Sequence, residues 1–340
     1  MEAEKWIGID IHKKQITVCI IIQNGKKSIK QYERNEKELA EFEKEIDRET
    51  VIGIESTNWT WDLIKRLKEK AKDTVIFNTI DLKKLMDRFK KTDKEDAERM
   101  AIILQRFEKD ELSTCQIRSD EEAEIRGLLS IREEMVSNKK SYKTKIIAML
   151  EYWGIKTSDR MFNDLEKNTK WVDEQKIPES IKKGVIQMYV MLENLKESIR
   201  VLDKDIELLS SERPGYNEIK EIIGIGNTTG AYIITKVGNI DRFKASKKFV
   251  SYMGLAPRVS ESDGKGTNGK ITRKVDGAFL RVIVQAAWIR IRYDKDMKAF
   301  YENVRIRRGK QKAIIAVARK MVVEVYYKLL NLKNDLKNEA

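Results

Sequence analysis

Four carboxylates occur at positions where they could hold divalent cations. Asp10 ends an apolar, strand-like run and Glu55 ends a second, while Asp93 and Asp96 lie three residues apart on one face of a predicted helix. Hard cations such as Mg²⁺ take oxygen ligands. Two such ions ~3.5–4 Å apart can activate an attacking oxygen and stabilise a leaving one at a phosphodiester. The four acids therefore predict a magnesium site for phosphodiester chemistry.

The elements that carry these acids read as an α/β fold. Ile7–Asp10 and Val51–Glu55 are both apolar runs with one glycine that lead directly into a carboxylate. Strand-like runs alternate with segments of helical apolar spacing, which is typical of a sheet that is at least partly parallel. The expected strands lie within 6–22, 28–33, 51–55 and 74–80, and the expected helices within 36–48, 59–72 and on to about residue 105.

Residues 119–212 predict an almost wholly helical segment. Apolar residues there alternate at spacings of three and four over more than three heptads, which is the seam pattern of packed helices. Two arrangements fit, and both can hold together: an antiparallel hairpin of 119–151 on 181–210 within one chain, or a coiled coil between two subunits. The seam consists of Val185, Met188, Leu192, Leu195, Ile199, Leu202, Ile206 and Leu209.

Pro214-Gly215 ends the helical segment, and a basic domain follows. Its glycine-rich stretch 254–276 predicts a loop or small hairpin, and two helices are expected over about 277–300 and 310–332. The expected domains are therefore 1–110, 111–212 and 213–340.

The positive charge is concentrated near the C-terminus. The formal net charge is +13; residues 1–210 hold 41 Lys+Arg and 42 Asp+Glu, whereas residues 211–340 hold 27 and 13. A concentrated basic region favours a nucleic-acid partner over a merely lysine-rich, solvated surface. A membrane surface fits less well, because the basic residues fall in glycine-containing loops as well as on helices.

Composition excludes several other kinds of site. The cysteines, Cys19 and Cys115, cannot form a disulfide framework or a zinc cluster, and a single histidine, His12, argues against a Ser-His-Asp triad. No run approaches the ~18–20 apolar residues that span a bilayer, and no signal peptide is visible. A reducing cytoplasm is the expected location.

The acids lie in three motifs, Gly8–Lys13, Ile54–Thr57 and Lys91–Ala97. Together these motifs resemble the four-acid motif of the insertion sequence 110 (IS 110) family of bacterial transposases, with Asn58 where that family often has glycine. The family's N-terminal domain resembles the RuvC-type Holliday-junction resolvases, with a ribonuclease-H-like fold. The resemblance implies an α/β RuvC-like domain, an all-α helical segment and a small, mostly helical basic domain. It also implies catalytic, metal-binding roles for Asp10, Glu55, Asp93 and Asp96.

The C-terminal part resembles the second, transposase domain of the same family, on the residues of 223–226, 238–243 and 252–258. That family places a serine before a glycine-rich basic loop. Ser262 falls at this position, with Ser260 as the alternative, and Asp263 stands where glycine is usual. The resemblance implies a serine that attacks a DNA phosphate and conserves the phosphodiester energy in a covalent phosphoserine link. Because a free hydroxyl is a poor nucleophile, we expect help from the carboxylate-held magnesium of the same or another subunit.

Glycines and basic residues in this part are candidates for phosphate contacts. Gly224-x-Gly226 before a helix resembles a helix-hairpin-helix, whose backbone N–H groups can hold a phosphate, and a plain tight turn explains it as well. The basic cluster at 305–312 suits backbone binding better than base reading. The candidates are Gly224, Gly226, Arg258, Lys265, Lys270, Arg273, Arg281, Arg305, Arg307 and Arg308.

The resemblance implies a DNA recombinase with Mg²⁺ as cofactor, guided by a structured bridge RNA that pairs with donor and target DNA. The helical seam predicts a homo-oligomer, a dimer or tetramer, formed through the coiled coil. Two alternatives remain open. A hydrolytic junction nuclease would use water and the four acids, so Asp10→Asn would abolish activity while Ser262→Ala would not. A non-catalytic, nucleic-acid-binding coiled-coil scaffold would show salt-sensitive binding without magnesium-dependent cleavage.

Overall fold

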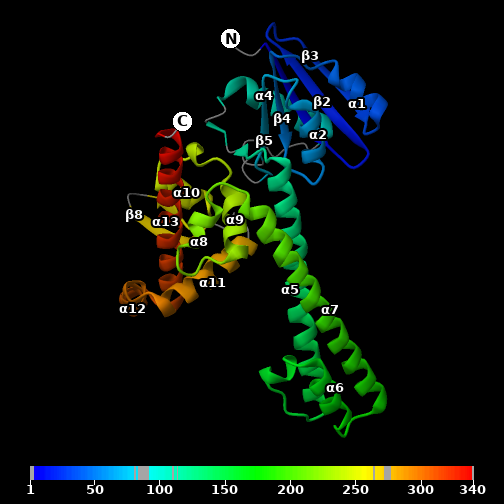
Figure 1. Ribbon diagram of the computed structural model, residues 1–340. Coiled ribbons are helices and arrows are strands. Elements are labelled where there is room, and N and C mark those ends of the chain that lie inside the picture. Colours follow the sequence, from blue (N-terminus) through cyan, green and yellow to red (C-terminus); the bar gives the residue numbers. More distant parts are fainter. Residues whose placement is uncertain are drawn as a thin grey trace. The chain divides into compact units, whose positions relative to one another are not determined.

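The computed structural model describes residues 4–79, 82, 92–108, 111–112, 114–262, 265–271 and 277–338 (Figure 1). The chain divides into two compact units, Met1–Ile117 and Arg118–Ala340. The expected division into 1–110, 111–212 and 213–340 stays a prediction. Within the described ranges, no helix combines the length and the apolar character needed to cross a membrane.

Unit 1 is built on a six-stranded sheet of order β3-β2-β1-β4-β5-β6. Strands β1 to β3 form an antiparallel meander, β4 and β5 continue the sheet parallel to β1, and β6 pairs antiparallel with β5. The expected α/β sheet with parallel neighbours is therefore confirmed. The strands are β1 Lys5–Ile11, β2 Gln15–Ile22, β3 Lys27–Glu33, β4 Thr50–Glu55, β5 Asp73–Phe77 and β6 Thr114–Cys115.

Helices cover both faces of this sheet. Helices α1 (Glu36–Glu43) and α2 (Thr60–Leu67) bury apolar side chains against one face, where isoleucines of β1 and β4 form the core. Helix α4 (Asp93–Arg106) packs on the other face. Because successive strand residues point to opposite faces, the alternation along β1 and β4 decides which side chains meet α4.

Unit 2 begins with a long antiparallel hairpin. Helices α5 (Asp120–Tyr152) and α7 (Glu179–Ser211) pack along each other, with the 3₁₀ turn η2 (Asp159–Phe162) and helix α6 (Leu165–Asp173) at their far end (Figure 1). Every seventh seam residue of α7 is buried and the seam residues between them are half-buried. The hairpin arrangement is therefore present within one chain, and a coiled coil between subunits stays a prediction.

The rest of unit 2 is mostly helical around one apolar core. The glycine-rich stretch forms a small antiparallel hairpin, as expected. The single helix expected over about 277–300 is wrong: it is two helices, because the Asp294 side chain accepts a hydrogen bond from the Met297 N–H (3.0 Å) and starts a new helix. The elements are α8 Tyr216–Lys220, α9 Asn227–Val237, η3 Ile240–Arg242, α10 Ser246–Tyr252, β7 Pro257–Ser262, β8 Lys265–Ile271, α11 Gly277–Tyr293, α12 Lys295–Arg308 and α13 Lys310–Asn338.

Candidate metal centre and phosphate pocket

A close helix–strand contact positions the acids of unit 1. A Cβ on Gly8 would lie 2.0 Å from the Ala97 carbonyl oxygen of α4 and 2.6 Å from the Ala101 nitrogen. A Cβ on Gly53 would lie 2.5 Å from the Phe77 ring and 2.8 Å from Leu104 of α4. At Gly8 a side chain would meet backbone atoms, so only glycine fits there, whereas at Gly53 it would displace neighbouring side chains. The two glycines let α4 lie directly on β1 and β4.

The same glycines define the face on which Asp10 and Glu55 lie. Gly8 pairs with Gly53 across the parallel β1–β4 ladder, and Ile9 pairs with Ile54. Each acid comes two residues after its glycine, so it points to the same face of the sheet. Asp10 and Glu55 therefore stand at adjacent strand ends on the side that α4 covers.

Helix α4 brings its own acids to this edge. Thr92 caps the helix by accepting a hydrogen bond from the Glu95 N–H, and Asp93 and Asp96 occupy the first turn. Carboxylates are stabilised near a helix N-terminus by the helix dipole. The cap thus fixes where α4 starts, and the contact at Gly8 fixes how close its first turn lies to β1.

Asp10, Asp93 and His12 form a cluster whose potential ligand atoms all lie within 4.8 Å of one another. His12 Nε2 is 3.1 Å from Asp10 Oδ2 and 3.2 Å from Asp93 Oδ1. Asp96 is near enough to act on the charge of Asp10. Neither the Asp96 nor the Glu55 carboxylate belongs to the 4.8 Å group.

The Asp10 carboxyl is buried, with 9% of the residue exposed. Burial raises the pKa of this carboxyl above its ordinary value, the negative charges of Asp93 and Asp96 raise it further, and His12 opposes the rise. A divalent cation would relieve this crowding of like charges, and the carboxylate oxygens are the donors that hard cations prefer. The arrangement therefore fits a divalent metal ion.

His12 is the cluster member that the sequence reasoning missed as a site residue. It follows β1 directly and lies two residues after Asp10, which places it on the same face of the chain. The spacing was visible in the sequence, but the approach of Asp93 to the imidazole depends on the packing of α4.

The candidate nucleophile lies at the end of a strand. Ser262 is the last residue of β7 and its backbone pairs with Lys265, while Ser260 pairs with Thr267. Side chains of 257–276 lie outside the described residues, and so do Asp263 and Arg273 altogether. The side-chain environment expected for Ser260, Ser262, Arg258, Lys265 and Lys270 thus stays a prediction.

The other expected cations have mixed environments. Arg281 on α11 pairs with Glu133 of α5, and Arg305 pairs with Glu302 at 2.6 Å. Arg307 donates to the Asn303 carbonyl oxygen (3.1 Å), and Arg308 has no ion pair among the described residues. All four side chains are largely exposed, so they are accessible to a ligand.

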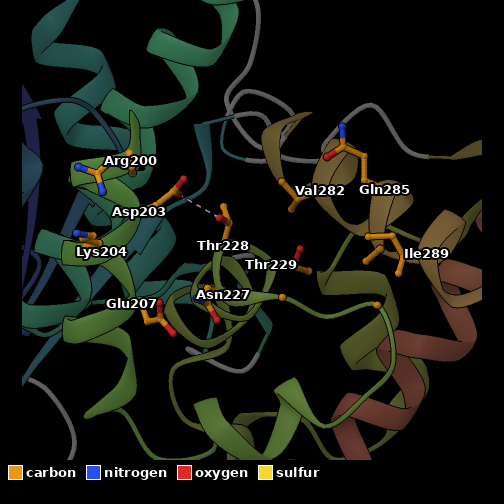
Figure 2. A pocket seen from close by; sticks show the side chains of 13 residues that line it. Arg200, Asp203, Lys204, Glu207, Asn227, Thr228, Thr229, Val282, Gln285 and Ile289 are labelled. Atoms are coloured by element: carbon orange, nitrogen blue, oxygen red, sulfur yellow. Dashed lines mark hydrogen bonds between the residues drawn. The ribbon is translucent and has the colours of Figure 1, made fainter. Parts of the chain in front are cut away.

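The glycine hairpin of unit 2 opens into a cavity of about 600 Å³ (Figure 2). A Cβ on Gly224, whose φ is +96°, would lie 2.4 Å from the Ala286 carbonyl oxygen of α11. Gly226 is the N-cap of α9 and provides no side-chain hydrogen bond to the helix. The first backbone N–H groups of α9 are therefore left for an external acceptor.

Polar side chains line this cavity. Figure 2 shows α7 side chains on one side, Val282, Gln285 and Ile289 of α11 on the other, and the first turn of α9 between them. Thr229 is only 8% exposed, and its hydroxyl has no hydrogen-bond partner among the described residues. The Thr228 hydroxyl donates to Asp203 Oδ1 at 3.4 Å. A helix N-terminus with free N–H groups and a spare hydroxyl suits an anion such as phosphate.

Comparison with known proteins finds a transposase-family match in each of these two regions. The profile of the DEDD transposase domain of the IS110 family matches residues 7–153, and a second profile, described as Transposase IS116/IS110/IS902 family, matches residues 216–302. The chain belongs to the IS110 family of transposases. The first matched range contains all four acids, and the second contains the glycine hairpin and Ser262.

Individual IS110-family relatives are distant. The transposase for insertion sequence element IS1111A of Coxiella burnetii is 22% identical over 68% of this chain and 64% of its own length. The transposase for IS1328 of Yersinia enterocolitica is 22% identical over 56% of this chain and 58% of its own. The match thus spans less than two thirds of these two relatives. The transposase for IS1533 of Leptospira borgpetersenii is 20% identical over 98% of both chains.

Proposed function

We propose that the protein is an insertion-sequence recombinase that cuts and rejoins DNA strands, with Ser262 as nucleophile and a Mg²⁺ site on Asp10, Glu55, Asp93 and Asp96. The observation that carries the proposal is the convergence of Asp10 and Asp93 at one edge of the sheet, in a chain of a transposase family. The antiparallel meander continued by parallel strands supports a ribonuclease-H-like, RuvC-like fold for unit 1.

The acids of unit 1 would hold the metal. A divalent ion there would supply the positive charge that activates an attacking oxygen and stabilises a leaving one. Asp10 is held by the backbone ladder, and Asp93 and Asp96 are held by the start of α4, so the oxygen ligands are pre-arranged by hydrogen bonds that exist without the ion. His12 bridges Asp10 and Asp93 and orients both carboxylates.

The serine in unit 2 would form the covalent link. Its hydroxyl oxygen attacks phosphorus, the Oγ–P bond forms, and the bond from phosphorus to a deoxyribose oxygen breaks. The serine proton is lost to a base, and the leaving oxygen takes up a proton. Energy is conserved because one phosphate ester bond replaces another, and the reverse step rejoins the strands. Arg258, Lys265, Lys270, Arg273 and Arg281 would neutralise charge on the phosphate.

Nucleic acid would be held through its backbone by unit 2. The first turn of α9 and the cavity behind Gly224 and Gly226 offer a phosphate site, and Arg305, Arg307 and Arg308 offer exposed cations. DNA is the substrate, a structured bridge RNA is the guide, and the active form is a homo-oligomer. The basic charge of the unit supports binding of both nucleic acids.

The deciding experiment measures strand joining and covalent protein–DNA adducts with a supercoiled donor DNA and the RNA that co-purifies with the protein. We expect Ser262→Ala to form no adduct and to join no strands, while Ser260→Ala, two residues away on the same strand, retains both. Full activity of Ser262→Ala would end the serine proposal. If that variant still nicked DNA and Asp10→Asn did not, the hydrolytic nuclease would be correct instead.

A further inference from the structure

The α5 face that packs on α7 is interrupted by positive charges. Its residues follow alternating spacings of three and four, like those of α7. The apolar members near both ends are buried, whereas the middle of the seam is half-buried and holds three cations. The seam consists of Glu122, Ile125, Leu129, Arg132, Val136, Lys139, Lys143, Ile146 and Leu150.

Contacts with η2 and α7 bring these cations together. Lys143 Nζ lies 4.9 Å from the centroid of the Phe162 ring. Lys196 Nζ of α7 donates to the Phe162 carbonyl oxygen at 2.9 Å and pairs with Glu193 at the same distance. Lys143 and Lys196 thus share one neighbour, although they come from different helices.

Lys139 lies among these charges, one turn before Lys143. Burial lowers the pKa of its amine, and the charges of Lys143, Arg132 and Lys196 lower it further, while Asp203 opposes them. Asp203 is already engaged with Arg132 at 2.5 Å. Among the residues that the structure describes, neither Lys139 nor Lys143 has a carboxylate within 4.0 Å. The hairpin cation patch, defined as Arg132, Lys139, Lys143 and Lys196, therefore has more positive than negative charge.

An apolar seam would hold two helices together better than this one. Crowded, half-buried like charges cost free energy unless an anion offsets them. Residues 1–210 as a whole contain nearly equal numbers of basic and acidic residues. The excess of positive charge in the patch therefore comes from where these residues lie, not from the composition of the segment. Lysine ammonium groups are common binders of phosphate as point charges.

We propose that the hairpin cation patch binds the phosphodiester backbone of a nucleic acid. The proposal rests on the proposed function, which supplies DNA and RNA as ligands. It gives the α5–α7 hairpin a nucleic-acid contact in addition to helix packing and the expected subunit association. Lys139 and Lys143 make the contact, and Lys196 adds charge from α7. The Arg132–Asp203 pair bounds the patch on the side of α9, whose Thr228 hydroxyl also donates to Asp203.

The test compares two double variants of the full-length protein. Lys139→Gln/Lys143→Gln removes two charges from the patch, and Lys140→Gln/Lys145→Gln removes two charges from exposed positions on the same helix. Binding is measured by fluorescence anisotropy with a labelled DNA duplex and an RNA duplex of the same sequence, over a series of salt concentrations. We expect the patch variant to bind on the order of ten-fold more weakly, with a salt slope smaller by about one per lysine. The control variant should change much less.

Lys139→Arg/Lys143→Arg should retain binding, because it keeps the charge. Weaker binding of the patch variant to both duplexes, or to only one of them, supports the proposal and shows which nucleic acid the patch binds. Equal losses of duplex binding in the patch and control variants would overturn the proposal. A patch variant that binds both duplexes normally but no longer self-associates would also overturn it, because the partner of the patch would then be carboxylates of a second copy. Binding is read without catalysis, so failure here would leave the strand-joining test of Ser262 unaffected.

Discussion

The environment of Asp10 is set by residues of two elements, the end of β1 and the start of α4. Asp10 is buried at the end of β1, faces Asp93 and Asp96 across the contact with α4, and is bridged to Asp93 by His12. Four acids in strand and helix contexts were predictable from the sequence, because strand-terminal position and i, i+3 spacing are local properties. The bridging role of His12 was not predictable, since it needs the distance between two elements that only packing fixes.

Replacing Asp10 should remove metal binding without destabilising the fold. Because the folded-state pKa of Asp10 is raised, ionising it lowers stability as the pH rises through that pKa. Without divalent ions at neutral pH, Asp10→Asn should therefore melt at a higher temperature than the wild type, and the difference should vanish at acid pH. Added Mg²⁺ should raise the melting temperature of the wild type, by an amount equivalent to about 2.7 kcal/mol at a hundredfold excess over its dissociation constant. Asp10→Asn should lose this response and strand cleavage.

The control for this prediction is Asp62→Asn, at an exposed aspartate of α2. It should keep the response of the melting temperature to Mg²⁺. An unchanged response of Asp10→Asn to Mg²⁺ in thermal melts would show that the ion binds elsewhere.

At the scale of elements, the packing of α4 on β1 decides whether the acids meet. Strands and helices of unit 1 were predictable from alternation and apolar spacing, and so was the hairpin of α5 and α7. The break between α11 and α12 was missed because the apolar pattern continues across Asp294, and only its capping hydrogen bond reveals a new helix start. The cations in the α5 seam could not be predicted from the sequence, because Arg132, Lys139 and Lys143 become half-buried only where α7 and η2 pack against α5.

Gly8→Ala should push α4 away from the sheet. The added methyl would lie 2.0 Å from a backbone oxygen, which cannot move without the helix. We expect a loss of about 1–3 kcal/mol or more in the free energy of unfolding, and a weaker Mg²⁺ response because Asp93 and Asp96 move with the helix. Urea unfolding and thermal melts with Mg²⁺ measure both effects.

Gly127→Ala is the matched control, since nothing lies within 4 Å of a Cβ at that helical position. It should stabilise α5 by about 0.5–1 kcal/mol. If Gly8→Ala unfolded like the wild type, the close contact of α4 and β1 would be wrong.

At the scale of the whole molecule, charge divides with the compact units. Residues 1–117 hold 24 Lys+Arg and 24 Asp+Glu, whereas residues 118–340 hold 44 and 31. The entire net charge of +13 therefore belongs to unit 2. Long-range attraction of a polyanion scales with such an excess, so unit 2 should account for the capture of nucleic acid and unit 1 for metal chemistry.

Expressing the units separately tests this division. Fragment 118–340 should fold, because its core is its own, and should bind a DNA duplex with an affinity that falls steeply with salt. Fragment 1–117 should bind the same duplex at least about ten-fold more weakly at low salt, since it has no net charge to attract phosphates. Circular dichroism establishes folding and anisotropy measures binding. Equal affinities of the two fragments would contradict the division.

The ladder between β1 and β4 has one more consequence. The separation of Asp10 and Glu55 is set by peptide bonds and their pairing, not by the bulk of the isoleucines around them. Exchanging Ile9 for valine keeps the number of backbone atoms and leaves both carboxylates in place, but inserting a single residue between Gly8 and Asp10 turns one carboxylate to the opposite face. We therefore expect relatives of this chain to differ in the composition of these strands and in the lengths of the connecting loops, but to keep the count of residues from glycine to acid.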